Sequence, residues 1–424
     1  MNDAWEAAAA THLRSVCAGR DRRPGSAENE AVTAYAAGAL RGAGWHVQQR
    51  GFEVLDWEGG AGRLDIGGVT FGVHTSPYSL GVRGLGPLVV ASTRAELERR
   101  VLSGAVVLLH GALAERPVTP KGYPFYEDDD HAGLVALLEG GAPLAVIGAT
   151  DACPELAGAL RPFPLFEDGT FAVPAGYLAQ EQGRVLMGLN GLPAAITLLG
   201  QRRAARACNV IARRGARAGR LVVTAHIDTK VGTPGALDNA AGVAILLLLA
   251  EMVAQVPSGP AAGLELVLIN GEDYYAASGE VSYLAQHGRE IGSAALAVNV
   301  DGAGYVKGRT AYSLYGCEGA LAEDARKVLE AHSLIEGAPW WQGDHALFAM
   351  RGRPAIALTS ERIDELNREV IHTAADTPAL VSSARLVEAA GAILELWRTL
   401  APAPRSPRRS SRHVSRRQAE KAHA

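Results

Sequence analysis

The chain has 424 residues, more than the roughly 100–200 of a typical single domain, so we expect two domains or one domain with a large insertion. Apolar residues make up 48% and charged residues only 20%, which excludes a disordered or fibrous protein. The formal net charge of −4 is unevenly distributed, because residues 401–424 hold seven basic side chains against one acid. Residues 1–400 therefore carry −10 and the tail +6.

Residues 5–43 place apolar side chains at helical spacing, with a break at 22–26, and so predict two helices joined by a loop. Alternating apolar residues over 45–55 then predict a strand. The first residues carry acids where a secretory signal would carry bases, and no apolar run approaches the ~18 residues of a membrane span. We therefore expect a cytoplasmic protein without a membrane segment.

Between 57 and 200 the sequence changes to short apolar runs separated by glycines, which predict strands. One predicted helix, over 132–139, interrupts them and follows Asp128, Asp129 and Asp130, since negative charge stabilises a helix N-terminus. Binding of a cation by the acidic run 127–130 is the alternative. We interpret this segment as an inserted β-rich module, with strands at 69–73, 88–90, 106–109, 145–147 and 195–198.

After 205, strand and helix patterns alternate, which indicates a mainly parallel α/β sheet. The helix over 240–253 is apolar nearly all round and should be buried. The arginine-rich stretch 202–220 is interpreted as surface of this domain. The other expected elements are strands at 221–225, 264–269, 294–300 and 354–359 and helices at 319–332 and 383–399.

Polar side chains follow the ends of these strands, where ligands bind in open α/β sheets. Two histidines and several acids meeting in a partly dry cleft would be forced to protonate unless cations neutralised them. Mixed imidazole and carboxylate ligation suits zinc best, with manganese or cobalt as alternatives, and a carboxylate shared by two metals gives a hydrolytic centre. The residues are His226, Asp228, Asp238, Asn239, Glu272, Asp273, Asp301 and His372.

The order His-x-Asp, Asp-Asn, Glu-acid, Asp and His resembles the di-zinc aminopeptidases related to bacterial leucyl aminopeptidase, aminopeptidase Y and glutamate carboxypeptidase II. The resemblance covers roughly 205–400 and, at Arg23-Pro24-Gly25-Ser26, the start of the chain. It implies a three-layer α/β/α fold of the zinc exopeptidase type, with a mixed, mainly parallel sheet. The catalytic domain would be 1–56 and 201–400, interrupted at 57–200 by a protease-associated domain and followed by a disordered basic tail, 401–424.

The resemblance also implies roles for the residues. A water bridging two zinc ions would attack the peptide bond at the N-terminus of the substrate, with Glu272 as its general base and Asp228 orienting His226. The five metal ligands would be His226 and Asp301 on one zinc, Asp273 and His372 on the other, and Asp238 on both. Taken singly, each residue also has a structural interpretation, such as Asp238 capping a helix; their joint occurrence in one order favours the metal site.

This sequence departs from the family pattern at two positions. The second acid of the Glu-acid pair is usually Glu, but here it is Asp273, one methylene shorter. The relatives carry Tyr before the final His, where this chain has Ile371, so a different donor must stabilise the oxyanion, if any does. Tyr274, Tyr275 and Tyr305 are the tyrosines nearby in sequence.

Four further candidate residues lie between the predicted helix at 319–332 and the predicted strand at 354–359. Asp344 matches the acid of the family's Ser-Asp-His loop and is a candidate for binding the substrate's α-ammonium group. His345 is either structural or functional, and Trp340 and Trp341 either line a side-chain pocket or simply pack.

Other functions of the same family stay open: a carboxypeptidase, a glutaminyl cyclase, or a non-catalytic binding protein. Glu272 favours catalysis, and all five ligand positions argue against a single-zinc cyclase. We expect a peptide substrate and no membrane partner. Nucleic acid is not expected as a partner, apart from contacts by the basic tail, and the oligomeric state is left open.

Overall fold

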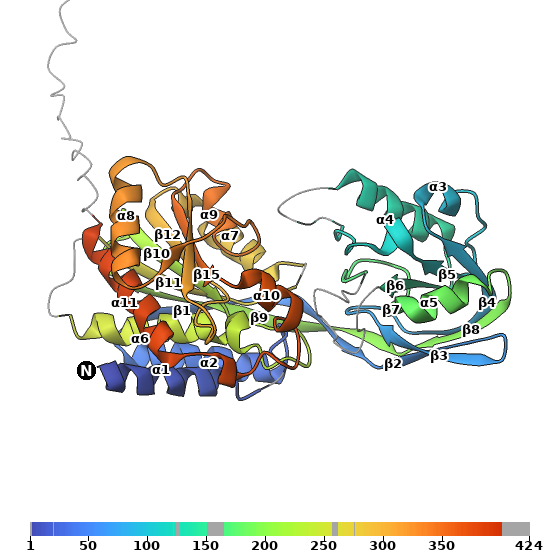
Figure 1. Ribbon diagram of the computed structural model, residues 1–424, viewed down its shortest axis with the longest axis horizontal. Coiled ribbons are helices and arrows are strands. Elements are labelled where there is room, and N and C mark those ends of the chain that lie inside the picture. The colour runs from blue at the N-terminus through green and yellow to red at the C-terminus, as the bar shows by residue number, and fades with distance from the viewer. Residues whose placement is uncertain are drawn as a thin grey trace, which may run out of the picture.

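The structure is a computed structural model that describes residues 2–19, 21–121, 123, 128–150, 165–256, 262–274 and 276–400. It contains an α/β domain built on one large sheet and a separate β-barrel (Figure 1). Cys153, Glu127, Tyr275 and the basic tail lie outside the described residues.

The large sheet has eight strands in the order β1-β9-β11-β10-β12-β15-β13-β14. Its centre is parallel, since β11, β10, β12 and β15 pair in parallel. Strand β9 pairs antiparallel with β1 and β11, and β13 pairs antiparallel with β15 but in parallel with the edge strand β14. The central strands are buried throughout, as expected when helices cover both faces. The strands are β1 (His46–Gly59), β9 (Gly200–Arg214), β10 (Arg220–His226), β11 (Leu264–Ile269), β12 (Ala294–Val300), β13 (Thr310–Tyr315), β14 (Ile335–Glu336) and β15 (Ala355–Ser360).

Helices pack on both faces of this sheet and form the outer two layers. One face carries the largest apolar cluster, to which α1, α2, α6, α8 and α11 contribute, and the other is covered by α7 and α9 (Figure 1). The helices are α1 (Asn2–Val16), α2 (Ala27–Gly42), α6 (Ala241–Ala254), α7 (Ser278–Ile291), α8 (Gly319–Ala331), α9 (Ala346–Ala349), α10 (Ile363–Glu369) and α11 (Ser383–Thr399).

Helix α6 lies at the centre of the core. Twelve of its residues are buried, from Ala241 to Val253, because its sequence is apolar on every side. The stretch Ala236–Ala254 is long and apolar enough to cross a membrane, but 94% of it is buried inside the fold, as in the core helix of an α/β domain. The predicted buried helix is thus confirmed, and cellular localisation stays a prediction.

The barrel is closed by seven strands in the order β2-β3-β7-β6-β5-β4-β8. The chain enters and leaves it along one antiparallel ribbon, since β1 pairs with β9 from His46–Arg213 to Gly59–Gly200. The expected boundaries at 56 and 201 fall in this ribbon; the division into domains and the protease-associated assignment stay predictions. The barrel elements are β2 (Ala61–Ile66), β3 (Val69–Thr75), β4 (Val82–Ala91), α3 (Arg94–Leu97), β5 (Val106–Leu109), α4 (Asp129–Gly141), β6 (Ala145–Thr150), β7 (Ala175–Ala179), α5 (Gln180–Met187) and β8 (Pro193–Leu198).

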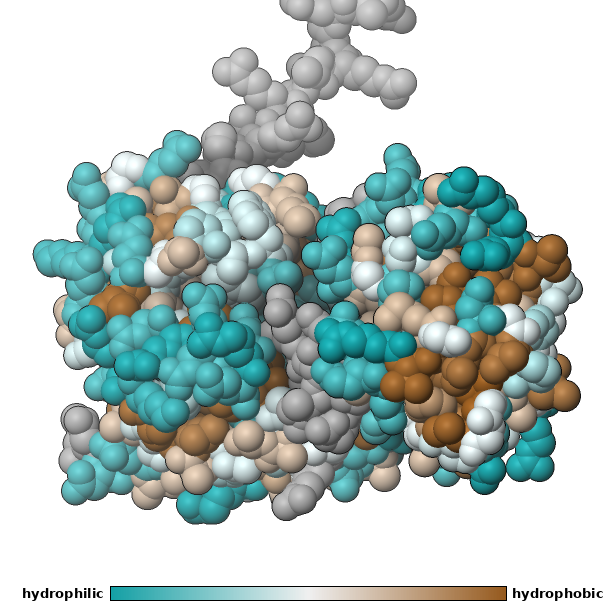
Figure 2. Space-filling model, turned by 45° about the vertical axis from the view of Figure 1, so that its right-hand side comes forward, coloured by the Kyte–Doolittle hydropathy of each residue, from teal (hydrophilic) through white to brown (hydrophobic). Residues whose placement is uncertain are grey.

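The barrel exposes more apolar surface than the α/β domain in the view of Figure 2. Apolar surface of this kind is typical of contact sites. Its exposed large apolar side chains among the described residues are Val69, Leu85, Val101, Val185 and Leu192.

Helix α4 begins at Asp129, three residues before the predicted start at 132, with Asp129 and Asp130 in its first turn. Asp128 is its N-cap, and the side chain accepts a hydrogen bond from the amide of His131. Helix α7, in contrast, has no sequence prediction, because its buried positions include the polar residues Glu280, Ser282 and His287.

The interpretation of 202–220 as surface is wrong for Arg220, which is 1% exposed. Arg220 and Arg213 both bind Glu265, at 3.0 Å and 2.6 Å, and the hydroxyl of Tyr283 donates to the same carboxylate. The anion at Glu265, the second residue of β11, lets two arginines enter the interior beside the sheet.

Glu265→Gln should lower the free energy of unfolding of the α/β domain by roughly 3–5 kcal/mol, because Arg213 and Arg220 would stay buried without their anion. Urea unfolding of the two proteins measures the difference. Glu290→Gln is the control: it removes a partly exposed partner of the same arginine and should cost less than about 1 kcal/mol. Equal effects of the two substitutions would contradict the prediction.

Candidate metal centre and active site

Asp238 lies at the centre of the predicted site. Its Oδ1 is 3.1 Å from Nε2 of His226, and its Oδ2 is 2.9 Å from Nε2 of His372. The two oxygens of this one carboxylate therefore face two different imidazole rings. Asp238 is not the cap of α6; instead, Oδ1 of Asn239 accepts the amide of Gly242, which leaves the Asp238 carboxylate available.

The other predicted ligands surround the same carboxylate. Oδ1 of Asp273 is 2.7 Å from Nε2 of His372, and Oδ1 of Asp301 is 3.6 Å from Nε2 of His226. Donor atoms of His226, Asp238 and Asp273 all lie within 4.8 Å of one another, and so do those of His226, Glu272 and Asp301. The fold thus brings all the residues of the predicted ligand set together from separate loops.

Strand order explains this convergence. His226 is the last residue of β10, and Asp301 directly follows β12, the parallel neighbour of β10. Glu272 and Asp273 follow β11, the neighbour on the other side. Because carboxyl ends of parallel strands share one edge, the three loops meet there.

The closest contact of Asp228 with His226 is made by the backbone of Asp228. Its backbone carbonyl, not its carboxylate, is 3.0 Å from Nδ1 of His226. The carboxylate instead accepts the backbone amides of Gly271, Glu272 and Asp273, at 2.6, 3.3 and 3.1 Å. Asp228 therefore positions the histidine and also the loop that presents Glu272.

The crowded carboxylates make the site strongly attractive for positive charge. Burial raises the pKa of Glu272 well above its ordinary value, and the carboxylate of Asp301 adds to the effect. Burial lowers the pKa of His372, but Asp273 and Asp238 outweigh it and raise it to about 10. A protein without cations would hold protons on its imidazoles to balance these anions.

Asp376 is a site residue without a sequence prediction. Its carboxylate accepts the backbone amides of Leu237 and Asp238, at 2.8 Å and 3.1 Å, and so fixes the turn that carries Asp238. Arg22 supports the same region from below: it is fully buried and donates to the carbonyls of Pro234 and Gly235. The sequence offers one signal for Asp376 and Arg22: each is a charged side chain within an apolar or turn-forming stretch.

Asp344 is 1% exposed, and its carboxylate interacts with that of Glu280, a buried acid of α7. Burial and the charge of Asp301 raise the pKa of Asp344 to about 7. Its role in substrate binding stays a prediction. The adjacent His345 is fully buried, and its Nε2 lies 2.8 Å from the carbonyl of Trp340; whether its role is structural or functional stays open.

The two described tyrosine candidates donate their hydroxyls elsewhere. Tyr274 donates to the carbonyl of Thr229 at 3.2 Å, and Tyr305 donates to Glu365 at 2.9 Å. Neither hydroxyl therefore replaces the tyrosine that relatives carry in place of Ile371. The predicted side-chain pocket at Trp340 and Trp341 stays a prediction; Trp341 is 57% exposed.

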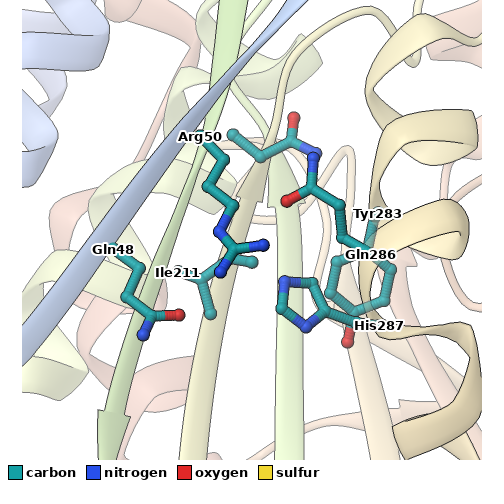
Figure 3. Close-up of a pocket in the computed structure, with 7 residues that line it drawn as sticks. Gln48, Arg50, Ile211, Tyr283, Gln286 and His287 are labelled. Atoms are coloured by element: carbon teal, nitrogen blue, oxygen red, sulfur yellow. The ribbon is translucent and has the colours of Figure 1, made fainter.

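A small cavity beside β9 is not a second active site. It measures about 10 Å³, enough for a single water, and lies between β9 and α7. Figure 3 shows Arg50, His287 and Gln286 pointing into it. A peptide does not fit there.

Residues 209–397 match peptidase family M28. The match covers 189 of the 424 residues, less than half of the chain. The M28 segment contains every predicted ligand and Glu272, and it begins at the end of β9, so it covers most of the α/β domain.

A curated relative is the protein named probable lipoprotein aminopeptidase LpqL, from Mycobacterium tuberculosis. It is 27% identical over 248 residues, which are 56% of this chain and 46% of LpqL. The match therefore spans about half the length of this curated relative.

Solved structures share the fold of the M28 segment and of the barrel. An aminopeptidase from Aneurinibacillus sp. strain AM-1 has a TM-score of 0.71 at 19% identity, covering 95% of this chain and 96% of its own. BSAP, a zinc aminopeptidase from Bacillus subtilis, has a TM-score of 0.68 at 18% identity, with 92% and 94% covered. A glutaminyl cyclase from Fimbriiglobus ruber is more distant, with a TM-score of 0.50 at 14% identity and 93% and 94% covered. These likenesses confirm the predicted α/β fold class.

Proposed function

We propose that this protein is a zinc-dependent aminopeptidase that hydrolyses the N-terminal bond of peptides. The observation that carries the proposal is the position of Asp238, whose two oxygens face two different histidines while Asp273, Asp301 and Glu272 surround them. The match of residues 209–397 to peptidase family M28 supports the reaction class.

The residues fit a pair of divalent cations. Nε2 of His226 and Oδ2 of Asp273 are buried and have no hydrogen-bond partner among the described residues, although each lies among oppositely charged groups. Unpaired imidazole nitrogen and carboxylate oxygen are the donors that zinc prefers. In our assignment His226 and Asp301 hold one zinc, Asp273 and His372 hold the other, and Asp238 holds both. Manganese or cobalt would suit the same donors.

In the proposed reaction, the side chains of the protein have separate roles. When bound, the two zinc ions polarise the scissile carbonyl and acidify water. Glu272 accepts a proton at its carboxylate and returns it to the nitrogen of the departing amine, as a general base and then a general acid. Asp228 holds the Glu272 amide and keeps this carboxylate in place.

A panel of aminoacyl p-nitroanilides tests the proposal. We expect hydrolysis that a chelator abolishes and that zinc restores, together with two metal ions per chain by elemental analysis. Full activity in demonstrably metal-free protein would contradict it. Blocking the substrate's N-terminal amine should abolish turnover; cleavage at the free carboxyl end instead would identify a carboxypeptidase.

Glutaminyl cyclisation is the second candidate, favoured by the shared fold with the Fimbriiglobus ruber enzyme. It requires an amide activated for attack by the substrate's own amine, with release of ammonia. Ammonia measured from glutaminyl peptides distinguishes it from hydrolysis. A non-catalytic binding protein would bind peptides without turning over any of these substrates.

A further inference from the structure

A buried ion pair joins the barrel to the candidate active site. Both carboxylate oxygens of Glu167 accept hydrogen bonds from Nζ of Lys230, at 2.9 Å and 3.0 Å. Glu167 belongs to the barrel, in the segment between β6 and β7, whereas Lys230 lies in the loop after β10. The two side chains are 1% and 4% exposed. Removing Glu167 would deprive the buried Lys230 charge of its main compensating anion.

The barrel holds Glu167 in a fixed position. Leu165, Phe166 and Phe171 on either side of it are buried in the barrel's apolar core, with the two phenyl rings stacked 4.5 Å apart. The carboxylate of Asp168 accepts the amides of Lys121 and Thr170 and closes the segment. Glu167 is therefore presented to the α/β domain from a rigid support.

On the other side of the pair, Lys230 contacts the loop that carries Glu272. Its Nζ lies 4.5 Å from the ring centre of Tyr274, which directly follows Glu272 and Asp273. Tyr274 is 2% exposed and donates its hydroxyl to Thr229. Its ring also meets the edge of Tyr78, between β3 and β4, at 5.9 Å. Tyr274 is thus clamped between the loop after β10 and the barrel.

We propose that Glu167 is a positioning residue for the catalytic site: it fixes Lys230, which holds Tyr274 and thereby sets the place of Glu272 and Asp273. The inference rests on the proposed peptidase function. Its physical basis is that a displacement of about 1 Å at a reacting group can cost on the order of 10² in rate. In this arrangement the barrel contributes directly to the geometry of the active site.

Glu167→Gln tests the proposal, because it keeps the size of the side chain and removes its charge. We expect kcat to fall at least ~10-fold with KM nearly unchanged and two metal ions retained. Hydrogen exchange should accelerate in peptides covering 271–274, because the amides of residues 271–273 bind Asp228. The matched control is Glu96→Gln, since the Glu96 carboxylate binds Ser92 inside the barrel, and it should change neither quantity.

A second variant covers the case in which Glu167→Gln does not fold. In Glu167→Leu/Lys230→Met the pair is replaced by apolar groups of similar volume, a change that is often neutral for stability. We expect it to fold, with lowered kcat and the same faster exchange.

Unchanged kcat or unchanged exchange at 271–274 in the folded variant overturns the inference. If the wild-type protein hydrolyses no peptide, the proposed function has failed, and the exchange comparison alone then decides whether Glu167 positions this loop.

Discussion

Glu272→Gln is expected to lower kcat for aminoacyl p-nitroanilides by on the order of 10²- to 10⁴-fold, the usual contribution of a general base. The amide that replaces the carboxylate has the same shape but does not take up the proton. Glu272 has no place in our ligand set, so the variant should still hold two zinc ions and unfold at the wild-type temperature. Steady-state kinetics, elemental analysis and a thermal melt on one preparation measure the three quantities.

The matched control is Glu323→Gln on the exposed side of α8, which should leave all three unchanged. Unchanged turnover in Glu272→Gln would mean that another residue moves the proton. A loss of zinc in the same variant would make Glu272 a ligand instead, in agreement with its donor atom lying within 4.8 Å of those of His226 and Asp301.

Asp238→Asn should have the largest effect on metal content. Each oxygen of this carboxylate faces a different histidine, so the amide removes a ligand from one position and the negative charge from both. We expect less than one zinc per chain under conditions in which the wild-type protein holds two. Hydrolysis should fall by on the order of 10³-fold or more, because electrostatic stabilisation of the transition state depends on both ions.

Asp301→Asn is the comparison for this experiment. Asp301 lies 3.6 Å from His226 and belongs to one position only in our assignment, so the variant should retain about one zinc. Equal metal loss in the two variants would contradict a bridging role for Asp238. Zinc-dependent stabilisation in thermal melts gives an independent measure, since a ligand that binds only the folded state raises its stability with concentration.

Elements with strong apolar patterns agree closely between sequence and structure. The predicted strands at 264–269 and 294–300 and the helix at 383–399 have the observed bounds of β11, β12 and α11. Strands β11 and β12 are buried almost throughout, and α11 buries one apolar face, so the apolar pattern defines each of them. Helix α7 was missed because polar residues occupy buried positions there.

The residues of the candidate site also fall into two groups, according to whether the sequence alone identifies them. Residues that carry the chemistry are recognisable from the sequence, because two histidines and several acids recur in one order at strand ends. Apart from Asp228, the residues that support them are not. Asp376 acts on the Asp238 backbone from 138 residues away, and Glu167 reaches Lys230 from the barrel, 63 residues away.

The sequence by itself determined the α/β alternation, the charge asymmetry of the tail and the residue types of the candidate centre, because each depends on local pattern and composition. Only the tertiary structure decided that Asp228 binds the Glu272 loop with its carboxylate, that Arg220 is buried on Glu265, and that the barrel contacts the active site. The physical reason is that hydrogen bonds and ion pairs join atoms that are close in space, and strand order, not spacing along the chain, brings those atoms together.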